Sequence, residues 1–287
     1  MANELTKTTE SALVPEKWGP RFLEKLYEPN RVLPRMLNVT GDYDGVGDIA
    51  HIAVEGTAWT VNDLGADGAL TVQANTLTDV SLTINKEKEV TVEVIKTLKR
   101  PGYSFSDRFD AFTRTASNSI REQMESDALA LYSDITQSSG SGAGDIGQDE
   151  VLDAIRQLRT TPKVDILANP EENTLVFHPK QFPALKKSNL FDYERSGVAG
   201  GGGVKMGLPS IFQVPVIFST QVGNTAGAHQ NLLFHKSAFA WAAHREPQYE
   251  SASGVGAGNL VEVMVCWALY GVKTVIANRA VIIKSAT

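Results

Sequence analysis

Apolar side chains recur every three or four residues over residues 103–136, the longest regular pattern in the chain. This spacing is the period of an α-helix, and charged residues occupy its other faces. The apolar positions are Phe105, Phe109, Phe112, Ala116, Ile120, Met124, Ala128, Leu131 and Ile135. The signals that begin the helix are Pro101, Gly102 and the capping-box pair Ser104 and Asp107. We predict one helix, roughly 50 Å long, along a flat side of an elongated molecule. A surface helix of an ordinary α+β domain is the alternative.

Apolar and polar residues alternate over residues 48–95, which predicts two long β-strands joined by a polar tip. The return strand carries apolar residues of one parity at Val80, Leu82, Ile84, Val90, Val92 and Val94. Strict alternation means that one face of the hairpin is buried and the other is exposed to solvent. An isolated two-stranded hairpin is marginal in water. Its apolar face must therefore be covered, either by an ordinary sheet of the same molecule or by a neighbour.

Residues 1–47 are punctuated by four prolines and predict an extended arm. The arm carries large side chains such as Trp18 and Phe22, but too few apolar residues for a core of its own. We expect these side chains to lie on a surface of the same subunit or of a neighbour.

The second half of the chain reads as an α/β region with closing strands. We predict helices at 148–159 and 179–185, a glycine-rich loop at 197–207, and a polar hairpin tip at 248–258. The predicted strands are 175–178, 211–219, 232–235, 238–243, 260–276 and 280–284.

The composition suits one large domain or two interleaved ones, with 287 residues, of which 42% are hydrophobic and 21% charged. The net charge of −6 and the lack of a basic block do not suggest a sequence-specific reader of nucleic acid. The start of the chain is unlike a signal peptide, and charged residues break the apolar stretch 260–283. We expect a soluble protein without a membrane span, intracellular where it is made.

The sequence contains no complete catalytic, cofactor-binding or metal-binding motif. The loop at 42–48 lacks two of the oxygen ligands that an EF-hand needs, and the glycine run at 200–203 is followed by Lys205-Met206, where a P-loop needs Lys and Ser or Thr. His178 and His235 each end a strand and are expected to be hydrogen-bonded structural residues. Cys266 lies in an apolar strand, where burial blunts a thiol. We therefore expect a protein that is not an enzyme.

The order of these parts resembles the major capsid proteins of tailed double-stranded DNA bacteriophages, the HK97-fold family. The stretches similar to the family's patterns are residues 46–52, 175–185, 214–219, 233–238 and 268–273, and Gln213 departs from a frequently seen glycine. The resemblance covers nearly the whole chain.

The resemblance implies an α+β, HK97-like fold with four parts. Residues 1–47 would be the N-terminal arm and residues 48–95 the extended loop. Residues 96–147 and 237–274, with the spine helix at 103–136, would form the peripheral domain. Residues 148–236 and 275–287 would form the axial domain.

The resemblance also implies a structural function. Pentamers and hexamers would close into an icosahedral phage head in the virion, made in the host cytoplasm, with a portal protein and packaged double-stranded DNA as partners. No Lys lies between Glu55 and Asn85, so we expect no covalent cross-link of the kind some relatives make through the extended loop. No long helical extension precedes the arm, so we expect a separate scaffolding protein.

The candidates for subunit-interface contacts are Trp18, Phe22, Trp59, Lys86, Lys88, Glu89, Arg100, Arg245 and Glu246. Three rival functions remain open at this point. They are an encapsulin-like compartment that encloses an enzyme, a soluble α/β enzyme, and a tail or decoration protein of a virion.

Overall fold

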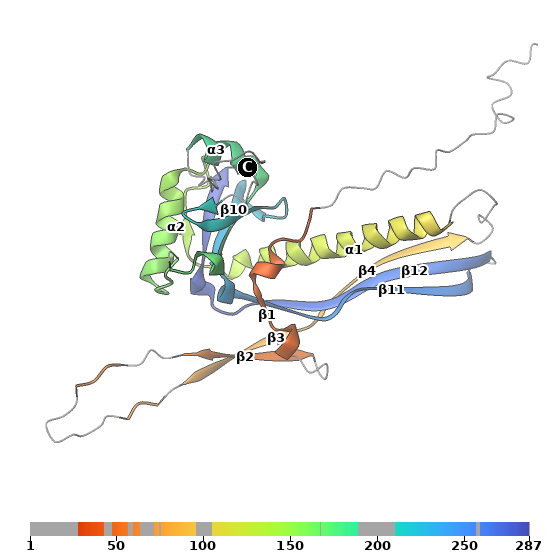
Figure 1. Ribbon diagram of the computed structural model, residues 1–287, viewed down its shortest axis with the longest axis horizontal. Coiled ribbons are helices and arrows are strands. Elements are labelled where there is room, and N and C mark those ends of the chain that lie inside the picture. The colour runs from red at the N-terminus through yellow and green to blue at the C-terminus, as the bar shows by residue number, and fades with distance from the viewer. Residues whose placement is uncertain are drawn as a thin grey trace, which may run out of the picture.

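The computed structural model describes residues 28–42, 48–56, 60–63, 72–74, 76–95, 105–166, 168–188, 210–256 and 259–286. The predicted arm up to residue 27, the glycine-rich loop 197–207, the middle of the 42–48 loop and the start of the long helix lie outside these ranges. The described chain forms a long helix and three separate sheets, arranged in an elongated molecule (Figure 1).

The predicted long helix is confirmed as α1, Phe105–Leu129, which continues as one 3-10 segment, Ala130–Asp134. Its 25 residues give a length of about 37 Å, shorter than the roughly 50 Å predicted, because residues 130–134 form a 3-10 segment instead of continuing the α-helix. The apolar stripe is buried as expected, since Ala116, Ile120, Met124 and Ala128 expose at most 4% of their surface. Periodicity alone thus identified both the helix and its buried face.

One face of a four-stranded sheet packs against α1 (Figure 1). The strands, in sheet order, are β1 (Leu37–Asn38), β11 (Phe239–Gly256), β12 (Asn259–Thr274) and β4 (Lys86–Ile95). The predicted hairpin tip at 248–258 is wrong in extent, because β11 and β12 stay paired out to Gly256 and Asn259. The polar and glycine residues of that stretch predicted a loop. Backbone hydrogen bonds between β11 and β12 nevertheless hold it as a β-strand.

A short hairpin, β2 (Ile49–Glu55) with β3 (Leu77–Thr83), forms a sheet of its own. The predicted hairpin extended to residue 95, and the structure corrects this boundary. The chain leaves the hairpin after Thr83, and β4 pairs with β12 instead. Alternation specifies that one face is buried and does not identify the partner that buries it.

The hairpin crosses β12 at Gly271, where a side chain would not fit. A Cβ atom at Gly271 would lie 2.3 Å from the carbonyl oxygen of Thr83. Beside this crossing, Leu82 and Ile84 are buried against Ala240 and Ala242. The base of the hairpin is therefore fixed to the sheet, while residues 60–63 and 72–74 lie far from the rest of the subunit (Figure 1).

A seven-stranded mixed sheet forms the other end of the molecule. Its strands are β5 (Ser138–Ser139), β13 (Ala280–Ala286), β10 (Ala228–His235), β6 (Asn173–Phe177), β8 (Val214–Phe218), β7 (Ser210–Ile211) and β9 (Asn224–Thr225). Residues from α2 (Gln148–Thr160) and α3 (Phe182–Lys187) bury one face of the sheet. These elements confirm the predicted helices at 148–159 and 179–185 and the predicted strands at 175–178, 232–235 and 280–284. The predicted strand 211–219 is wrong in extent, because residues 212 and 213 form a turn between β7 and β8.

The main hydrophobic core joins the two large sheets through α1. It includes Val176, Leu232 and Phe234 from the seven-stranded sheet, and Phe239 and Tyr270 from the four-stranded sheet. The rings of Phe234 and Phe239 meet edge to face, with their centroids 5.4 Å apart. The two ends of the molecule therefore share one core with the carboxyl-terminal half of α1.

The turn between β7 and β8 is strained. Ile211 pairs with Val214, so the loop has two residues, and Phe212 and Gln213 have φ angles of +52° and +66°. Both angles lie in the left-handed region, which favours glycine and penalises a side chain. A glycine at position 213, as the family resemblance implies, would relieve this penalty.

We predict that Gln213→Gly raises the free energy of unfolding of the unassembled subunit by about 0.5–1 kcal/mol. Chemical denaturation measures the change. The matched control is Gln213→Ala, which keeps a Cβ atom and should give no comparable gain. An equal gain in both variants would show that the backbone conformation is not the cause.

Candidate subunit interfaces

The hairpin exposes apolar side chains that its own subunit does not cover. Val61 and Val72 are 96% and 92% exposed, and Leu77 is 67% exposed. The region is nevertheless ordered by polar contacts. The Gln73 side chain accepts a hydrogen bond from the amide of Thr60 and donates one to its carbonyl. Exposed apolar side chains without cover are typical of a surface that binds another molecule.

The predicted interface residue Lys86 makes an ion pair inside its own subunit. Its Nζ lies 3.0 Å from Oδ2 of Asp127 on α1, and the Tyr270 hydroxyl donates to the same oxygen at 2.7 Å. Burial alone would raise the pKa of Asp127, but the hydrogen bonds from Tyr270 and Lys86 outweigh it and lower that pKa. Lys86 thereby ties β4 to α1, and a second role between subunits stays a prediction.

Arg245 and Glu89 lie on the sheet face that points away from α1, which we call the outer sheet face. The Arg245 guanidinium stacks 4.9 Å from the centroid of the Trp267 ring, and Trp267 is the direct neighbour of Glu89 in the ladder. Gln248 and Glu250 extend this face along β11, opposite Trp267 and Val265. The structure thus brings two of the predicted residues together around one half-buried aromatic platform.

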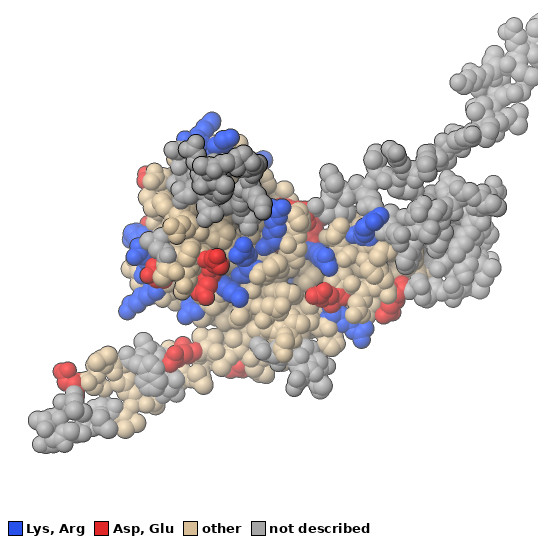
Figure 2. Space-filling view, viewed as in Figure 1, with Lys and Arg blue, Asp and Glu red and all other residues tan. Residues whose placement is uncertain are grey.

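Lys88 and Glu246 lie on the opposite side of the sheet. Lys88 pairs with the buried Ala268, whose side faces α1, and Glu246 lines a pocket with Arg121 of α1. Charges of both signs interleave at this end of the molecule (Figure 2). The remaining candidates, Trp18, Phe22, Trp59 and Arg100, lie outside the described residues.

A buried carboxylate joins α1, the N-terminal segment and the seven-stranded sheet. Glu125 is 3% exposed and accepts hydrogen bonds from the amide of Arg31 at 2.9 Å and from the hydroxyl of Ser219 at 3.0 Å. Burial raises the pKa of Glu125 despite these bonds. Nearby, Glu28 accepts hydrogen bonds from the amide and hydroxyl of Thr220 at 2.9 and 2.6 Å.

These two acids hold residues 28–32 against the body. Glu125 and Asp127 were not among the predicted site residues, although both flank the apolar stripe of the helix, where a carboxylate requires a partner. One sequence does not reveal that partner, because Arg31, Ser219 and Tyr270 are all distant along the chain.

Two histidine rings stack where β6 ends and β10 begins, in the middle of the seven-stranded sheet. His178 and His229 lie 3.8 Å apart with an angle of 8° between their planes. Neither ring nitrogen of the buried His229 has a hydrogen-bond partner among the described residues. Burial lowers the pKa of both rings, and each has Lys180 nearby as a further cationic influence. His178 also accepts from the Lys180 amide, which agrees with the structural role expected of it.

The described residues offer little for catalysis. They contain no group of three or more His, Cys, Asp or Glu side chains placed to hold a metal. Burial raises the pKa of the Cys266 thiol, as its apolar strand predicted. His235 makes contacts to Ser237 and Glu172 and is structural, as expected. Within the described ranges, no helix is both long and apolar enough to cross a membrane.

Comparison with known proteins identifies related folds. A family model described as phage capsid protein matches residues 89–284. A structure from Mycobacterium phage Che8 is 20% identical with a TM-score of 0.70, and the alignment covers 94% of this chain and 96% of that chain. The capsid structure of the cyanophage P-SCSP1u is 10% identical with a TM-score of 0.67 and coverages of 96% and 94%. A structure from Gordonia phage Cozz is 14% identical with a TM-score of 0.65 and coverages of 98% and 94%. No curated protein matches the chain.

We predict that Glu125→Ala lowers the free energy of unfolding of the unassembled subunit by about 2–4 kcal/mol, because buried donors of Arg31 and Ser219 lose their acceptor. Chemical denaturation measures the loss, and hydrogen exchange should quicken in residues 28–32. Glu122→Ala, one turn earlier on the helix and less buried, is the matched control. A loss no larger than that of the control would contradict the prediction.

We predict that acidification weakens the subunit through the stacked histidines. Their pKa values are lowered in the folded state, so the unfolded chain binds more protons as the pH falls below about 6.5. The free energy of unfolding should fall by up to about 1.4 kcal/mol per pH unit for each histidine that stays neutral. His229→Phe keeps a flat ring without nitrogens and should reduce this slope between pH 7 and 5. An unchanged slope in the variant would assign the pH dependence to other groups.

Proposed function

The chain belongs to the phage capsid protein family and has an HK97-like α+β fold, and from this premise we propose that its copies close into an icosahedral head around double-stranded DNA. It is a structural capsid subunit of a virion and not an enzyme. The observation that carries the proposal is the hairpin, in which Val61 and Val72 are more than 90% exposed in the single subunit. A neighbour supplies the cover that the subunit lacks.

The proposed parts follow the three sheets. Residues 48–83 form the extended loop that lies across a neighbour, which shortens the expected segment 48–95. The four-stranded sheet with α1 forms the peripheral domain, from residues 86–137 and 237–274. The seven-stranded sheet forms the axial domain, from residues 138–236 and 275–287, which meets its copies in pentamers and hexamers. The expected boundary at 147 moves to 137 because β5 pairs with β13. Residues 1–27 form an arm on a neighbouring surface. This shortens the expected arm 1–47, because Val32, Leu33 and Met36 are buried in the core of their own subunit and β1 pairs with β11.

The shell is held by noncovalent contacts. No lysine lies between Glu55 and Asn85, so the hairpin has no amine for a covalent cross-link. A separate scaffolding protein and a portal protein are the partners in assembly, which takes place in the host cytoplasm. The packaged DNA is held without sequence specificity, which is compatible with a net charge of −6.

An encapsulin-like compartment is not favoured, because the family match is to phage capsid protein. The decisive experiment is negative-stain microscopy of the chain expressed with its scaffolding protein. Closed shells of uniform size support the proposal. A discrete soluble monomer or dimer under the same conditions would reject it.

We predict that Arg245→Glu strongly lowers the yield of particles and leaves the subunit folded. The change places a carboxylate over Trp267 beside Glu89 and Glu250, which makes the outer sheet face repel an acidic partner. The loss of the stacked cation should cost only about 0.5–1 kcal/mol in the subunit. Sedimentation and microscopy count the particles, and circular dichroism checks the fold.

Arg245→Lys keeps the charge over the ring and is the matched control. Normal particles from Arg245→Glu would remove Arg245 from the interface. Glu246→Arg applies the same test to the side of the sheet that faces α1.

A further inference from the structure

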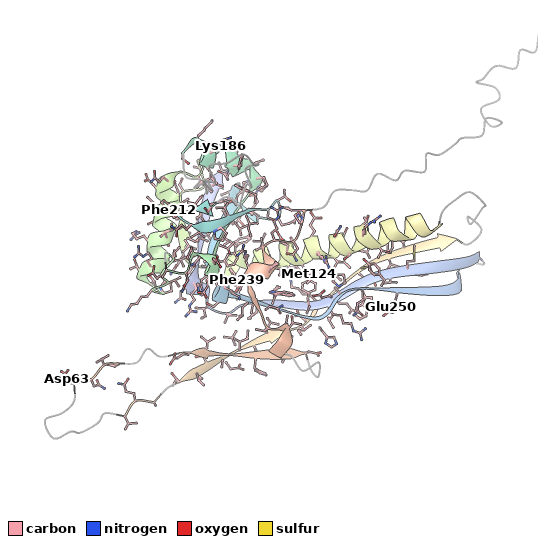
Figure 3. The ribbon with its side chains drawn as sticks, in the orientation of Figure 1. Asp63, Met124, Lys186, Phe212, Phe239 and Glu250 are labelled. Atoms are coloured by element: carbon pink, nitrogen blue, oxygen red, sulfur yellow. The ribbon has the colours of Figure 1, made fainter. Side chains whose placement is uncertain are left out.

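A cavity of about 650 Å³ lies on one face of the seven-stranded sheet, and we call it the sheet-face cavity. Alternate residues of two paired strands share a face and form its floor, namely Ala228 and Gln230 of β10 and Ile282 and Lys284 of β13. The opposite face of the sheet is buried by α2 and α3, and Phe212, labelled in Figure 3, packs on that helical side. The volume falls in the range of sites that hold small ligands.

A glycine-rich loop after β5 forms one wall of the cavity through residues 141–143. The loop is held in place, because the amide of Ala286 donates a hydrogen bond to the carbonyl of Gly144 at 2.8 Å. Gly142 has a φ angle of +77°, and a Cβ atom there would lie 2.9 Å from the Cβ atom of Ala228. Glycine therefore allows the loop to approach the sheet closely, and the wall is formed before any ligand binds.

A second wall follows α1 and contains Tyr132. The ring of Tyr132 lies directly over Gly223, where a Cβ atom would overlap its carbon atoms. The Tyr132 hydroxyl shares a hydrogen bond of 2.8 Å with the hydroxyl of Thr225, which also lines the cavity. Two hydroxyls carry two hydrogens and this bond uses one, so one hydrogen remains for another acceptor. The Ser141 hydroxyl also keeps its hydrogen, because its oxygen accepts from the amide of Ala143.

Among the described residues of its lining, the cavity carries one positive charge and no negative one. The positive charge is Lys284, which makes no ion pair with any residue in the described ranges. The next acid along the second wall, Asp134, is held elsewhere, because the hydroxyl of Thr274 donates to its carboxylate at 2.7 Å. This local excess of positive charge contrasts with the net charge of −6 of the whole chain. Such a cavity attracts an anion.

We propose that the sheet-face cavity binds a phosphate group, with Lys284 as its counter-charge. The hydroxyls of Ser141 and of the Tyr132–Thr225 pair donate hydrogen bonds to it. A phosphate offers more acceptor oxygens than a carboxylate, which suits the several donors gathered here. The cavity is larger than a bare phosphate, so its apolar lining at Ile135 contacts the carbon atoms of the carrier.

The carrier of the phosphate group is either a small phosphate ester or the backbone of packaged DNA. The described walls and the cation all belong to a single subunit. The inference therefore goes beyond the proposed function and does not depend on assembly. Binding to the unassembled chain tests the site whether or not shells form.

Isothermal titration calorimetry of the unassembled chain measures binding of thymidine monophosphate at constant ionic strength. We expect Lys284→Gln to weaken this binding at least about tenfold, because it removes the cation of the site. The matched control is Lys236→Gln, which makes the same change of net charge at an exposed residue beyond the other end of β10. It should bind like the parent chain, and circular dichroism checks that both variants are folded.

A second variant tests the site without a change of charge. Ser141→Ala removes one donor at an exposed position of the loop, where the substitution leaves the core intact. We expect binding to weaken about fivefold, as for the loss of one hydrogen bond. The control is Ser133→Ala, because Ser133 also lines the cavity but already donates its hydrogen to the carbonyl of Ala130 at 3.2 Å. It should bind normally.

A short DNA duplex, titrated in the same way, identifies the carrier. Duplex binding that weakens in Lys284→Gln as much as mononucleotide binding assigns the site to the DNA backbone. A loss confined to the mononucleotide assigns the site to a small phosphate ester. Either result supports the phosphate site.

Three results overturn the proposal. The first is that neither thymidine monophosphate nor the duplex binds the parent chain. The second is that Lys284→Gln binds both probes as well as Lys236→Gln does. The third is that acetate displaces thymidine monophosphate as effectively as inorganic phosphate does, because the cavity would then not select phosphate.

Discussion

The burial of one helical stripe between two sheets is the constraint on which this subunit depends. Ala116, Ile120, Met124 and Ala128 are almost wholly buried, and the residues that cover them come from both sheets. Apolar burial is proportional to area, so a stripe shared by two sheets stabilises both and their relative placement at once. The two ends of the molecule therefore behave as one elongated platform. A flat platform has a large surface for its volume, which leaves its arms to be covered by other molecules.

Polar contacts then fix the positions of β4 and of the N-terminal segment relative to α1, which apolar packing alone does not determine. Asp127 holds Lys86 of β4 and the Tyr270 hydroxyl, and Glu125 holds the segment at Arg31 and the turn at Ser219. A buried carboxylate is costly unless its acceptors are filled, so these two residues permit only a narrow set of positions for the elements that they join. They specify the geometry of the joints more than they add to the total stability. The hairpin is different, because its buried contacts end near Leu82.

Much of the fold could be predicted from the sequence, because its periodic patterns are long. The stripe of α1 and the fully buried strand at Asn173–Phe177 follow from local spacing alone. The identity of a strand's partner does not, and β4 was joined to the wrong sheet for this reason. The polar stretch before Gly256 was predicted as a hairpin tip but is part of a β-strand, since an exposed pair of strands needs few apolar residues. For the interfaces, charge and exposure identified Arg245 and Glu89 as candidates. That both residues lie beside Trp267 could not be predicted, because it depends on the register between β4, β12 and β11.

Weak and separate contacts suit the assembly that this subunit enters. One exposed valine gives little affinity, and the hairpin alone is marginal. Repetition around a closed shell multiplies such contacts, because each further contact within the shell is intramolecular and has a high effective concentration. Contacts that were individually strong would trap misplaced subunits, whereas weak ones dissociate and allow correction. The combination of a rigid platform with small, repeated contacts at its margins therefore favours a closed shell over an irregular aggregate.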